Sequence, residues 1–407
     1  MTNTEPQNRK ISSEVMEESS IMSVEAGAPL EVPAEMAGGA AEEERIYVAG
    51  QWQLMWWKFR RHKMAIVGAI ILIVFYLIGA FCEFVAPYDP EAYFIRYKMA
   101  PPTPIHIFDA TGKLRGPFIY HRDRSQDRET LRDIYTENRD IIYPLHFFVK
   151  GSPYKLWGIW KSEIHLFGLA PDIEEQAVFL VGADRMGRDL FSRLCYGARL
   201  SLSIGLIGVF LSLALGIVLG GISGYYGGRV DTVIQRVIEF IRTIPTIPLW
   251  MALSAALPAD WPVVKMYFGI TIILSLVGWT GMARVVRGRF LSLRQEDFVL
   301  AARLCGSSEF RIIIRHMVPS FLSYIIASLT LSIPGQILGE TGLSYLGLGL
   351  RAPAISWGVL LQEAQNVRSL AMAPWLLFGP AVSVILTVFA YNFLGDGLRD
   401  AADPYAR

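Results

Sequence analysis

Six long apolar stretches constrain this chain more than any other feature of its sequence. A helix needs roughly 20 apolar residues to cross about 30 Å of hydrocarbon. Hydrophobic residues make up 52% of the 407 residues and charged residues only 18%. The sequence therefore predicts an all-α polytopic membrane protein with six transmembrane helices, which we place at residues 64–85, 200–222, 231–257, 266–286, 324–346 and 375–393.

The third of these spans needs its own argument. Its uninterrupted apolar part is too short to cross a bilayer, so we expect the helix to start near Asp231. Arg236 and Glu239 then form an i, i+3 pair in its polar first turns. Pro245 and Pro248 are expected to bend the helix, which spans buried in a bundle tolerate.

Basic and aromatic residues predict the orientation of the spans. Tryptophan, lysine and arginine cluster between residues 56 and 63, just before the first span, as at a cytoplasmic membrane interface. Seven arginines lie between 284 and 315, whereas the short loops assigned to the outside hold only Lys265, Arg351 and Arg368. This asymmetry places both termini and the loop between the fourth and fifth spans in the cytoplasm.

The remaining segments suggest how the chain is organised. Residues 1–50 are rich in Glu and poor in aromatic residues, as in a disordered acidic cytoplasmic tail. A basic, aromatic collar and the first span occupy 51–86. The insert 87–198, extracytoplasmic by parity, is too apolar for a linker, so a folded subdomain is expected. A five-helix core, 199–407, contains the cytoplasmic loop 287–320.

Small residues recur every four positions along the second span. Such a ladder lets a neighbouring membrane helix approach closely. It serves either static packing or a face that slides during gating. The ladder consists of Gly208, Ser212, Gly216, Gly220, Gly224 and Gly228.

Signals for catalysis or cofactor binding are missing. There is no GxxxxGK[ST], HExxH, GxSxG or paired-cysteine motif, and the four histidines of the insert lack HxH or HxxxH spacing. The net charge of +1 gives no indication of a nucleic-acid partner. Glu340, in the fifth span, is the clearest intramembrane acid. It is a candidate for the pathway or for gating, or it is a residue near the outer end that water reaches.

The cytoplasmic loop contains two short amphipathic helical segments within "VLAARLCGSSEFRIIIRHMVP", residues 299–319. Gly306 is expected to end the first helix in a left-handed conformation. Ser307 is expected to cap the second helix, with Glu309 near its positive end. The two apolar faces, at i, i+3, i+4 and i+7, consist of Phe298, Ala301, Ala302 and Cys305, and of Phe310, Ile313, Ile314 and Met317.

This loop resembles the EAA loop of binding-protein-dependent ABC importer permeases, whose pattern is Glu-Ala-Ala, three residues, then Gly. Ala301, Ala302 and Gly306 match, and Leu300 stands at the glutamate position. Four other stretches resemble the oligopeptide/dipeptide (peptide/opine/nickel) branch, with Ala183 where threonine is usual. They are "GADRMGRDLFSRLCYGARLSL" (182–202), "GYYGGRVD" (224–231), "GETGLSYLGLGL" (339–350) followed by "SWG", and "NFLGDGLRDAADP" (392–404).

The resemblance implies a permease subunit in the bacterial cytoplasmic (inner) membrane that forms half of a pathway for peptides or peptide-like solutes. Its implied partners are a second homologous permease subunit, two ATP-binding cassette subunits and an extracytoplasmic solute-binding protein. ATP and Mg would bind to the ATPase subunits, so no cofactor is expected on this chain. The loop would dock into an ATPase groove through Phe298, Ala301, Ala302, Cys305, Gly306, Ser307 and Arg311.

Two other classes of protein stay open on the residues alone. A self-contained secondary carrier for small solutes is the main alternative, and a polytopic membrane enzyme is the weaker one. The lack of a nucleotide motif fits all three classes, whereas only an importer subunit explains the cytoplasmic loop. Peptide length and the choice among peptides, opines and nickel chelates are left undetermined by the sequence.

Overall fold

The computed structural model describes residues 51–402 except 110–111, 127, 129–132, 172, 174–175 and 259, and the side chains of 51–52 and 368–369 are also outside the description. The predicted acidic tail, 1–50, lies outside the described residues. The chain divides into two compact units, Met1–Leu54 and Met55–Arg407. In the first unit only residues 51–54 are described, as the start of a helix, and the architecture below is that of the second.

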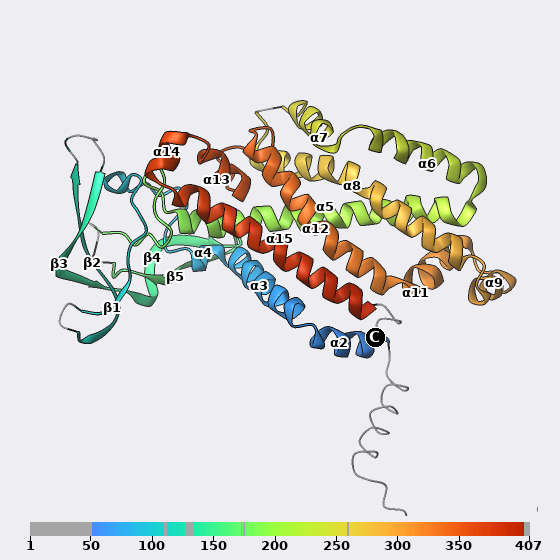
Figure 1. Cartoon of the computed structure of the whole chain (residues 1–407), viewed down its shortest axis with the longest axis horizontal. Coiled ribbons are helices and arrows are strands. Elements are labelled where there is room, and N and C mark those ends of the chain that lie inside the picture. Colours follow the sequence, from blue (N-terminus) through green and yellow to red (C-terminus); the bar gives the residue numbers. More distant parts are fainter. Residues whose placement is uncertain are drawn as a thin grey trace, which may run out of the picture. The chain divides into compact units, whose positions relative to one another are not determined.

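Within the described residues, five long helices are apolar enough to cross a membrane, and a bent pair of helices is a sixth candidate. The pair consists of α6 (Gly228–Thr243) and α7 (Thr246–Ala255), which meet at 85°. The mostly helical, polytopic fold is thereby confirmed, with six spans if the bent pair counts as one. The five long helices, drawn in Figure 1, are α3 (Lys63–Ala80), α5 (Leu190–Tyr226), α8 (Val263–Leu293), α12 (Leu322–Tyr345) and α15 (Trp375–Ala402).

The break in the third span lies at Pro245 alone. Ile244 has extended backbone (φ −81°, ψ 127°), as expected for a residue before proline, and Pro245 then forms the N-cap of α7. Pro248 lies in the first turn of α7, where its missing N–H has no intrahelical partner to lose. The predicted bend is therefore present, but Pro248 does not contribute to it.

Short elements connect the long ones. The loop between α8 and α12 is helical for most of its length, and two short helices lie between α12 and α15. The short elements are α2 (Gln51–Arg61), α4 (Cys82–Val85), a 3-10 turn (Ile95–Tyr97), α9 (Asp297–Leu304), α10 (Glu309–Arg311), a π-helical segment (Ile312–Met317), α11 (Val318–Ser320), α13 (Trp357–Glu363) and α14 (Val367–Met372).

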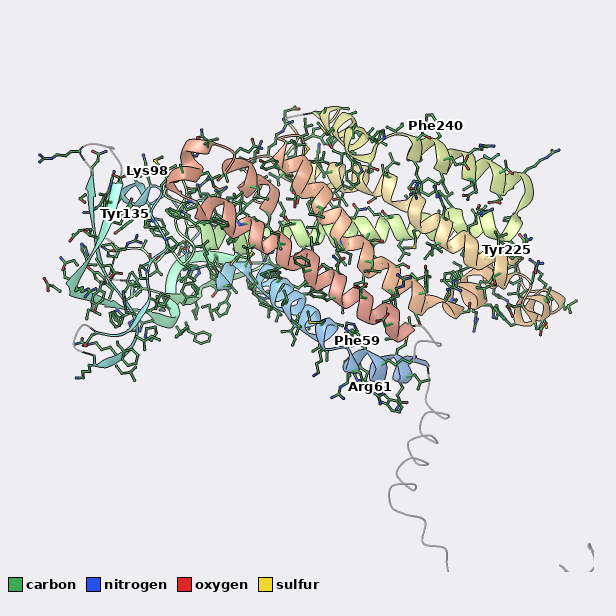
Figure 2. All side chains as sticks on the ribbon, in the orientation of Figure 1. Phe59, Arg61, Lys98, Tyr135, Tyr225 and Phe240 are labelled. Atoms are coloured by element: carbon green, nitrogen blue, oxygen red, sulfur yellow. The ribbon has the colours of Figure 1, made fainter. Side chains whose placement is uncertain are left out.

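The insert between α4 and α5 contains two antiparallel sheets, which the all-α description did not include. Tyr135 of β3 donates its hydroxyl to the Lys98 carbonyl at 3.1 Å, and Figure 2 shows the two residues side by side. The first sheet has the order β1–β2–β3, and β4 and β5 form a separate hairpin. The strands are β1 (His106–Phe108), β2 (Leu114–Gln126), β3 (Asp133–Pro144), β4 (His146–Leu156) and β5 (Trp160–Gly168).

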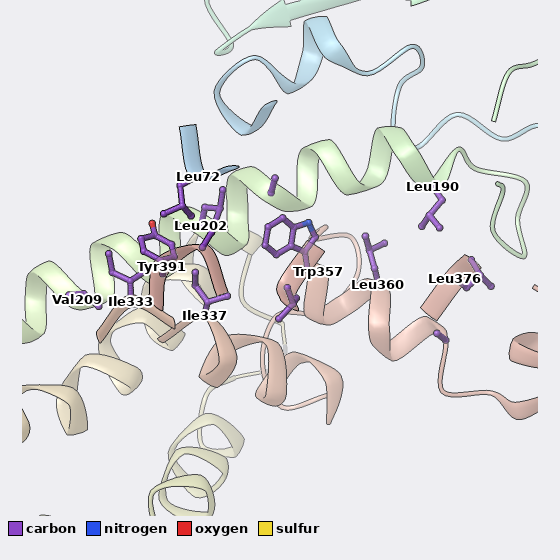
Figure 3. Packing of buried hydrophobic residues seen from close by; sticks show 14 of the residues in the cluster. Leu72, Leu190, Leu202, Val209, Ile333, Ile337, Trp357, Leu360, Leu376 and Tyr391 are labelled. Atoms are coloured by element: carbon purple, nitrogen blue, oxygen red, sulfur yellow. The ribbon is translucent and has the colours of Figure 1, made fainter. Parts of the chain in front are cut away.

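The largest apolar core joins α3, α5, α12, α13 and α15. Trp357 of α13 is 1% exposed and lies between Leu202 of α5 and Leu360, while Tyr391 of α15 lies beside Ile333 of α12 (Figure 3). A second cluster at the other end of α5 includes Tyr225 and residues of the α8–α12 loop. The long helices thus fix the position of that loop through apolar contacts.

Candidate functional site

The first helix of the α8–α12 loop, α9, ends at Leu304, and Gly306 follows its C-cap. This glycine has φ +71°, the left-handed conformation predicted for it. Its N–H donates to the Arg303 carbonyl at 2.9 Å, and the Ser307 N–H donates to the Ala302 carbonyl at 3.1 Å. These two bonds form a Schellman motif, which satisfies the last carbonyls of the helix and reverses the chain direction.

The predicted capping role of Ser307 is wrong. Ser308 is the N-cap of the next helix, and its Oγ accepts the Arg311 N–H at 3.4 Å. Ser308 has the extended backbone of an N-cap (φ −64°, ψ 148°), while Ser307 still belongs to the Schellman turn through its N–H. Glu309 does lie in the first turn of α10, where a carboxylate favours the helix dipole.

The apolar face predicted for α9 is divided between two environments. Val299 is fully buried and Ala302 half-buried, both packed in the cluster that contains Ile312. Phe298, Ala301 and Cys305 are exposed instead. Ala302 therefore packs partly against the chain's own core, whereas the sequence predicts it on the docking face. Val299 and Ala302 lie three residues apart on one side of α9. That side turns inward because α5 and α8 present an apolar surface to it.

Sequence reasoning missed Leu304, the most exposed apolar side chain described in this loop. Leu304 is 90% exposed, Phe310 is 76% exposed and Phe298 is 40% exposed, and we call these three apolar side chains of the loop the α9 surface. Arg311, a predicted coupling residue, is also exposed beside it. Leu304 falls outside the i, i+3, i+4, i+7 pattern and was therefore not predicted as a docking residue. Large apolar residues on both sides of a glycine turn are a usable signal of such a surface.

Polar contacts hold the loop against the end of α5. The Arg303 guanidinium lies 4.9 Å from the ring centroid of Tyr225, which is labelled toward the right-hand end of the bundle in Figure 2. Next to it, the Tyr226 hydroxyl donates to the Glu309 carboxylate at 2.5 Å. Through these contacts the α9 surface is fixed to the end of α5, so the surface and the helix are expected to move together.

A bidentate ion pair joins α6 to α8 close to the same loop. Nε and Nη2 of Arg287 each donate to a different carboxylate oxygen of Asp231 at 2.5 Å, and Ser223 of α5 donates to the same carboxylate. Arg294, at the end of α8, lies next to Gly227 in the α5–α6 turn. The bidentate geometry restricts the orientation of the two side chains more than a single hydrogen bond would. Together with the Ser223 contact it joins the ends of α5, α6 and α8 at one carboxylate.

The glycine ladder of α5 lies mainly against α8. A Cβ added at Gly216 would meet the Met282 side chain at 2.7 Å, and one added at Gly224 would meet the Phe290 Cβ at 2.6 Å. Gly220 meets the Ala283 backbone, and Gly208 faces Gln336 of α12 and Ser275 of α8. The absence of side chains at these positions is what allows α5 and α8 to approach closely.

Glu340 is buried in a cage of serine hydroxyls. It is 0% exposed, so the expectation that water reaches it is wrong. One oxygen accepts the Ser344 and Ser356 hydroxyls, each at 2.8 Å, and the other accepts the Ser201 hydroxyl at 3.2 Å. The cage connects α5, α12 and the N-cap of α13, because the serines come from all three.

An ion network at the start of α5 was also missed. Arg193 is 2% exposed and donates to both oxygens of Glu363 at 2.6 and 2.9 Å, and to Asp184 at 2.9 Å. Arg188 donates to Asp184 at 2.6 Å. Burial alone would lower the pKa of Arg188, but the neighbouring Asp184 carboxylate outweighs it and the pKa is raised. The charged residues of "GADRMGRDLFSRL" could have indicated this ion network.

A cavity of about 430 Å³ lies among α5, α7, α8 and α12. Its lining includes Ser212, Trp250, Thr280 and Gln336. The Gln336 side chain is buried, and within the described part of the chain its Oε1 has no hydrogen-bond partner. An unpaired amide oxygen at a cavity wall can accept a hydrogen bond from a passing solute. Among the described residues, no cluster of His, Cys, Asp or Glu could hold a metal ion.

Comparison with known proteins agrees with this picture. A family model described as "Binding-protein-dependent transport system inner membrane component" matches residues 216–407, and one described as "N-terminal TM domain of oligopeptide transport permease C" matches 50–102. The chain is 39% identical over 226 residues to the oligopeptide transport system permease protein OppC of Bacillus subtilis, covering 56% of this chain and 72% of that protein. The chain is also 31% identical over 353 residues to the glutathione transport system permease protein GsiD of Escherichia coli, covering 87% of this chain and 90% of that protein.

The helical bundle and its exposed loop define a permease subunit of a membrane transport system, not an enzyme. The chain belongs to the family of binding-protein-dependent ABC importer permeases, in the branch of the oligopeptide and dipeptide permeases. The resemblance inferred from the five sequence motifs is thus confirmed, and the chain is an inner-membrane protein. The alternatives of a self-contained carrier and a membrane enzyme are set aside.

Proposed function

We propose that this chain forms half of the translocation pathway for peptides or peptide-like solutes, and that a second homologous permease subunit forms the other half. The names of its relatives, which include oligopeptide, dipeptide and glutathione permeases, support this substrate class. The cavity beside Gln336 supports it as well, because amide groups of a peptide match an unpaired amide oxygen.

In this proposal two ATP-binding cassette subunits carry the ATP and Mg, and this chain binds neither. The observation that carries the proposal is the α9 surface, where Leu304, Phe298 and Phe310 are exposed on a loop that is otherwise held in place. An exposed apolar helix face suits a hydrophobic groove on a partner. Movement of an ATPase subunit would reach α5 through the contacts of Arg303 with Tyr225 and of Glu309 with Tyr226.

The proposal also assigns sides of the membrane. Both termini and the α9 surface face the cytoplasm, and the insert faces a solute-binding protein on the other side. The arginines between 284 and 315 support this orientation through the positive-inside rule. The organisation into a tail at 1–50, a collar and first span at 51–86, an insert at 87–198 and a core at 199–407 belongs to the same proposal.

The test is to place a charge on the α9 surface. We expect Leu304→Asp to separate the ATPase subunits from the purified complex in detergent, because an unpaired charge buried in an interface costs several kcal/mol, or a hundredfold or more in affinity. Val367→Asp is the matched control, since Val367 is 80% exposed on α14, away from this loop. Copurification of the ATPase subunits and solute uptake are measured for both. If the Leu304→Asp complex assembles and transports normally, the α9 surface is not the dock.

A further inference from the structure

The tip of the β4–β5 hairpin exposes a cluster of large apolar side chains. The sequence "LWGIW" turns the hairpin between Leu156 and Trp160, which are cross-strand partners. Trp157 is 49% exposed, Ile159 is 70% exposed and Trp160 is 57% exposed. Trp157 has φ +52°, a strained conformation for a bulky residue, and its ring packs edge-on against Trp160. The turn thus holds three apolar side chains away from the sheet.

This hairpin folds back along the end of the first span. The Trp157 indole N–H donates to the Ala80 carbonyl at 2.6 Å, and Ala80 is the last residue of α3. Farther from the tip, Phe148 packs on Phe84, and His165 Nδ1 lies 2.6 Å from the Ala86 carbonyl. The base of the hairpin therefore contacts residues beyond the span, while its tip lies level with the end of the span. In Figure 1 the two strands lie beside α4.

The residues that the hairpin tip contacts continue the exposed apolar stripe of α3. Ile70, Val74 and Leu77 are 55%, 46% and 52% exposed and lie on one helical face. Phe81 follows at the next position of that stripe, at i+11 from Ile70, and the Trp157 ring packs against it at 5.6 Å. No described residue covers these α3 side chains, and α3 is a candidate span, so we take the stripe to face acyl chains, with the tip of the hairpin at the edge of the same lipid.

Two lysines that form no ion pair with the described residues lie next to the apolar tip. Lys155 and Lys161 are direct cross-strand partners, an arrangement of like charges that weakens a hairpin. Neither belongs to an ion pair of the described chain. Both line a groove of about 620 Å³ whose wall includes a third lysine, Lys150, and one acid, Glu163. The groove is thus suited to an anion.

We propose that the β4–β5 hairpin is a membrane-interface element that binds anionic phospholipid. Trp157, Ile159 and Trp160 enter the interfacial region beside α3, as tryptophans do in the aromatic belts of membrane proteins. Lys155 and Lys161 contact lipid phosphates, which removes the repulsion between them. A bilayer is favoured over a protein partner because the tip is continuous with the lipid-facing stripe of a span.

The first test measures the depth of the tip in the full chain, reconstituted in nanodiscs of phosphatidylcholine and phosphatidylglycerol. Cys305→Ser removes the exposed thiol, and an NBD fluorophore is attached at Ile159→Cys. We expect strong quenching by doxyl-labelled lipid and at least fivefold weaker quenching by iodide than at the control site Ile134→Cys, which is 45% exposed on β3. An NBD group at 159 that iodide reaches as readily as at 134 overturns the proposal. So does protection at 159 that requires added solute-binding protein, because the surface is then a protein interface.

The second test concerns the lysines. With the fluorophore at 159, quenching by doxyl-phosphatidylglycerol is compared with quenching by doxyl-phosphatidylcholine. We expect Lys155→Gln with Lys161→Gln to lower the preference for the anionic lipid at least fivefold, since each lysine near a membrane surface contributes about fivefold. The matched control is Lys98→Gln with Lys113→Gln, two exposed lysines of the same insert that lie outside the hairpin. An unchanged preference in the hairpin variant shows that these lysines do not bind anionic lipid.

Discussion

At the scale of single residues, Glu340 shows how surroundings decide the role of an intramembrane acid. Three serine hydroxyls point at its carboxylate, and each serine oxygen in turn accepts a backbone N–H, from Leu350, Trp357 or Val359. Each hydroxyl thus has both of its bonding partners, and the carboxylate is the shared acceptor. This arrangement favours a structural role for Glu340 over a role in the solute pathway, because its side chain does not line the cavity.

We expect Glu340→Ala to lower the free energy of unfolding by about 3 kcal/mol, because it leaves three buried hydroxyl groups without their acceptor. Glu340→Gln should cost less than half of that. Its Oε1 can still accept from Ser344 and Ser356, which share one oxygen in the native cage, and its amide can donate to Ser201. The free energy of unfolding of the unsubstituted chain and of the two variants is measured by chemical denaturation in detergent. Equal losses for the two variants would show that the hydroxyl cage does not set the stability at this position.

At the scale of secondary-structure elements, α6 contacts α8 through a short apolar stripe and through an ion pair at the start of α6. Ile238 of α6 is buried with Trp279 and Ala283 of α8, whereas most other α6 side chains are exposed or half-buried. The bidentate pair of Asp231 and Arg287 then fixes the start of α6 against the cytoplasmic part of α8 proposed above. Losing that pair should loosen α6 without unfolding the bundle.

We expect Asp231→Asn to lower the free energy of unfolding by about 2 kcal/mol, the range for hydrogen bonds to charged groups in a partly buried site. Arg236→Gln is the control on the same helix. Its ion pair with Glu239 has side chains that are 79% and 58% exposed, so the loss should stay below about 1 kcal/mol. A double-mutant cycle with Arg287→Gln supplies the coupling energy, measured by unfolding. If the effects of Asp231→Asn and Arg287→Gln simply add, the pair does not join α6 to α8.

At the scale of the whole molecule, the bent pair α6–α7 decides on which side of the membrane the α9 surface lies. If the pair crosses the bilayer, the chain has six spans and the α8–α12 loop is opposite the insert. If it is re-entrant, the chain has five spans, and the loop is on the same side as the insert. The arginines between 284 and 315 favour six spans by the positive-inside rule.

We therefore expect single cysteines at Gln295 and Arg139 to be labelled from opposite faces of the membrane by an impermeant maleimide. Both positions are exposed, one in the α8–α12 loop and the other on β3. Cys305 is replaced by serine in this background, because it is the exposed thiol, while Cys82 and Cys195 are buried. Labelling of both positions from one face would support the five-span arrangement and contradict the proposed orientation.

The sequence by itself determined five of the spans, the family and the turn at Gly306. A bilayer imposes length and apolar composition on each crossing helix separately, so a span can be recognised without knowing its neighbours. The break at Pro245 was foreseeable for the same reason, because proline acts on the residue just before it. The left-handed glycine is likewise decided by a few adjacent residues.

Only the tertiary structure decided which side chains of α9 are buried and what surrounds Glu340. The helical pattern of α9 allows more than one inward face, and the ends of α5 and α8 select Val299 and Ala302, which leaves Leu304 outside. The serines around Glu340 come from α5, α12 and the residue before α13. Residues 139 positions apart, such as Ser201 and Glu340, meet only because the helices pack, and packing depends on the whole set of apolar surfaces at once.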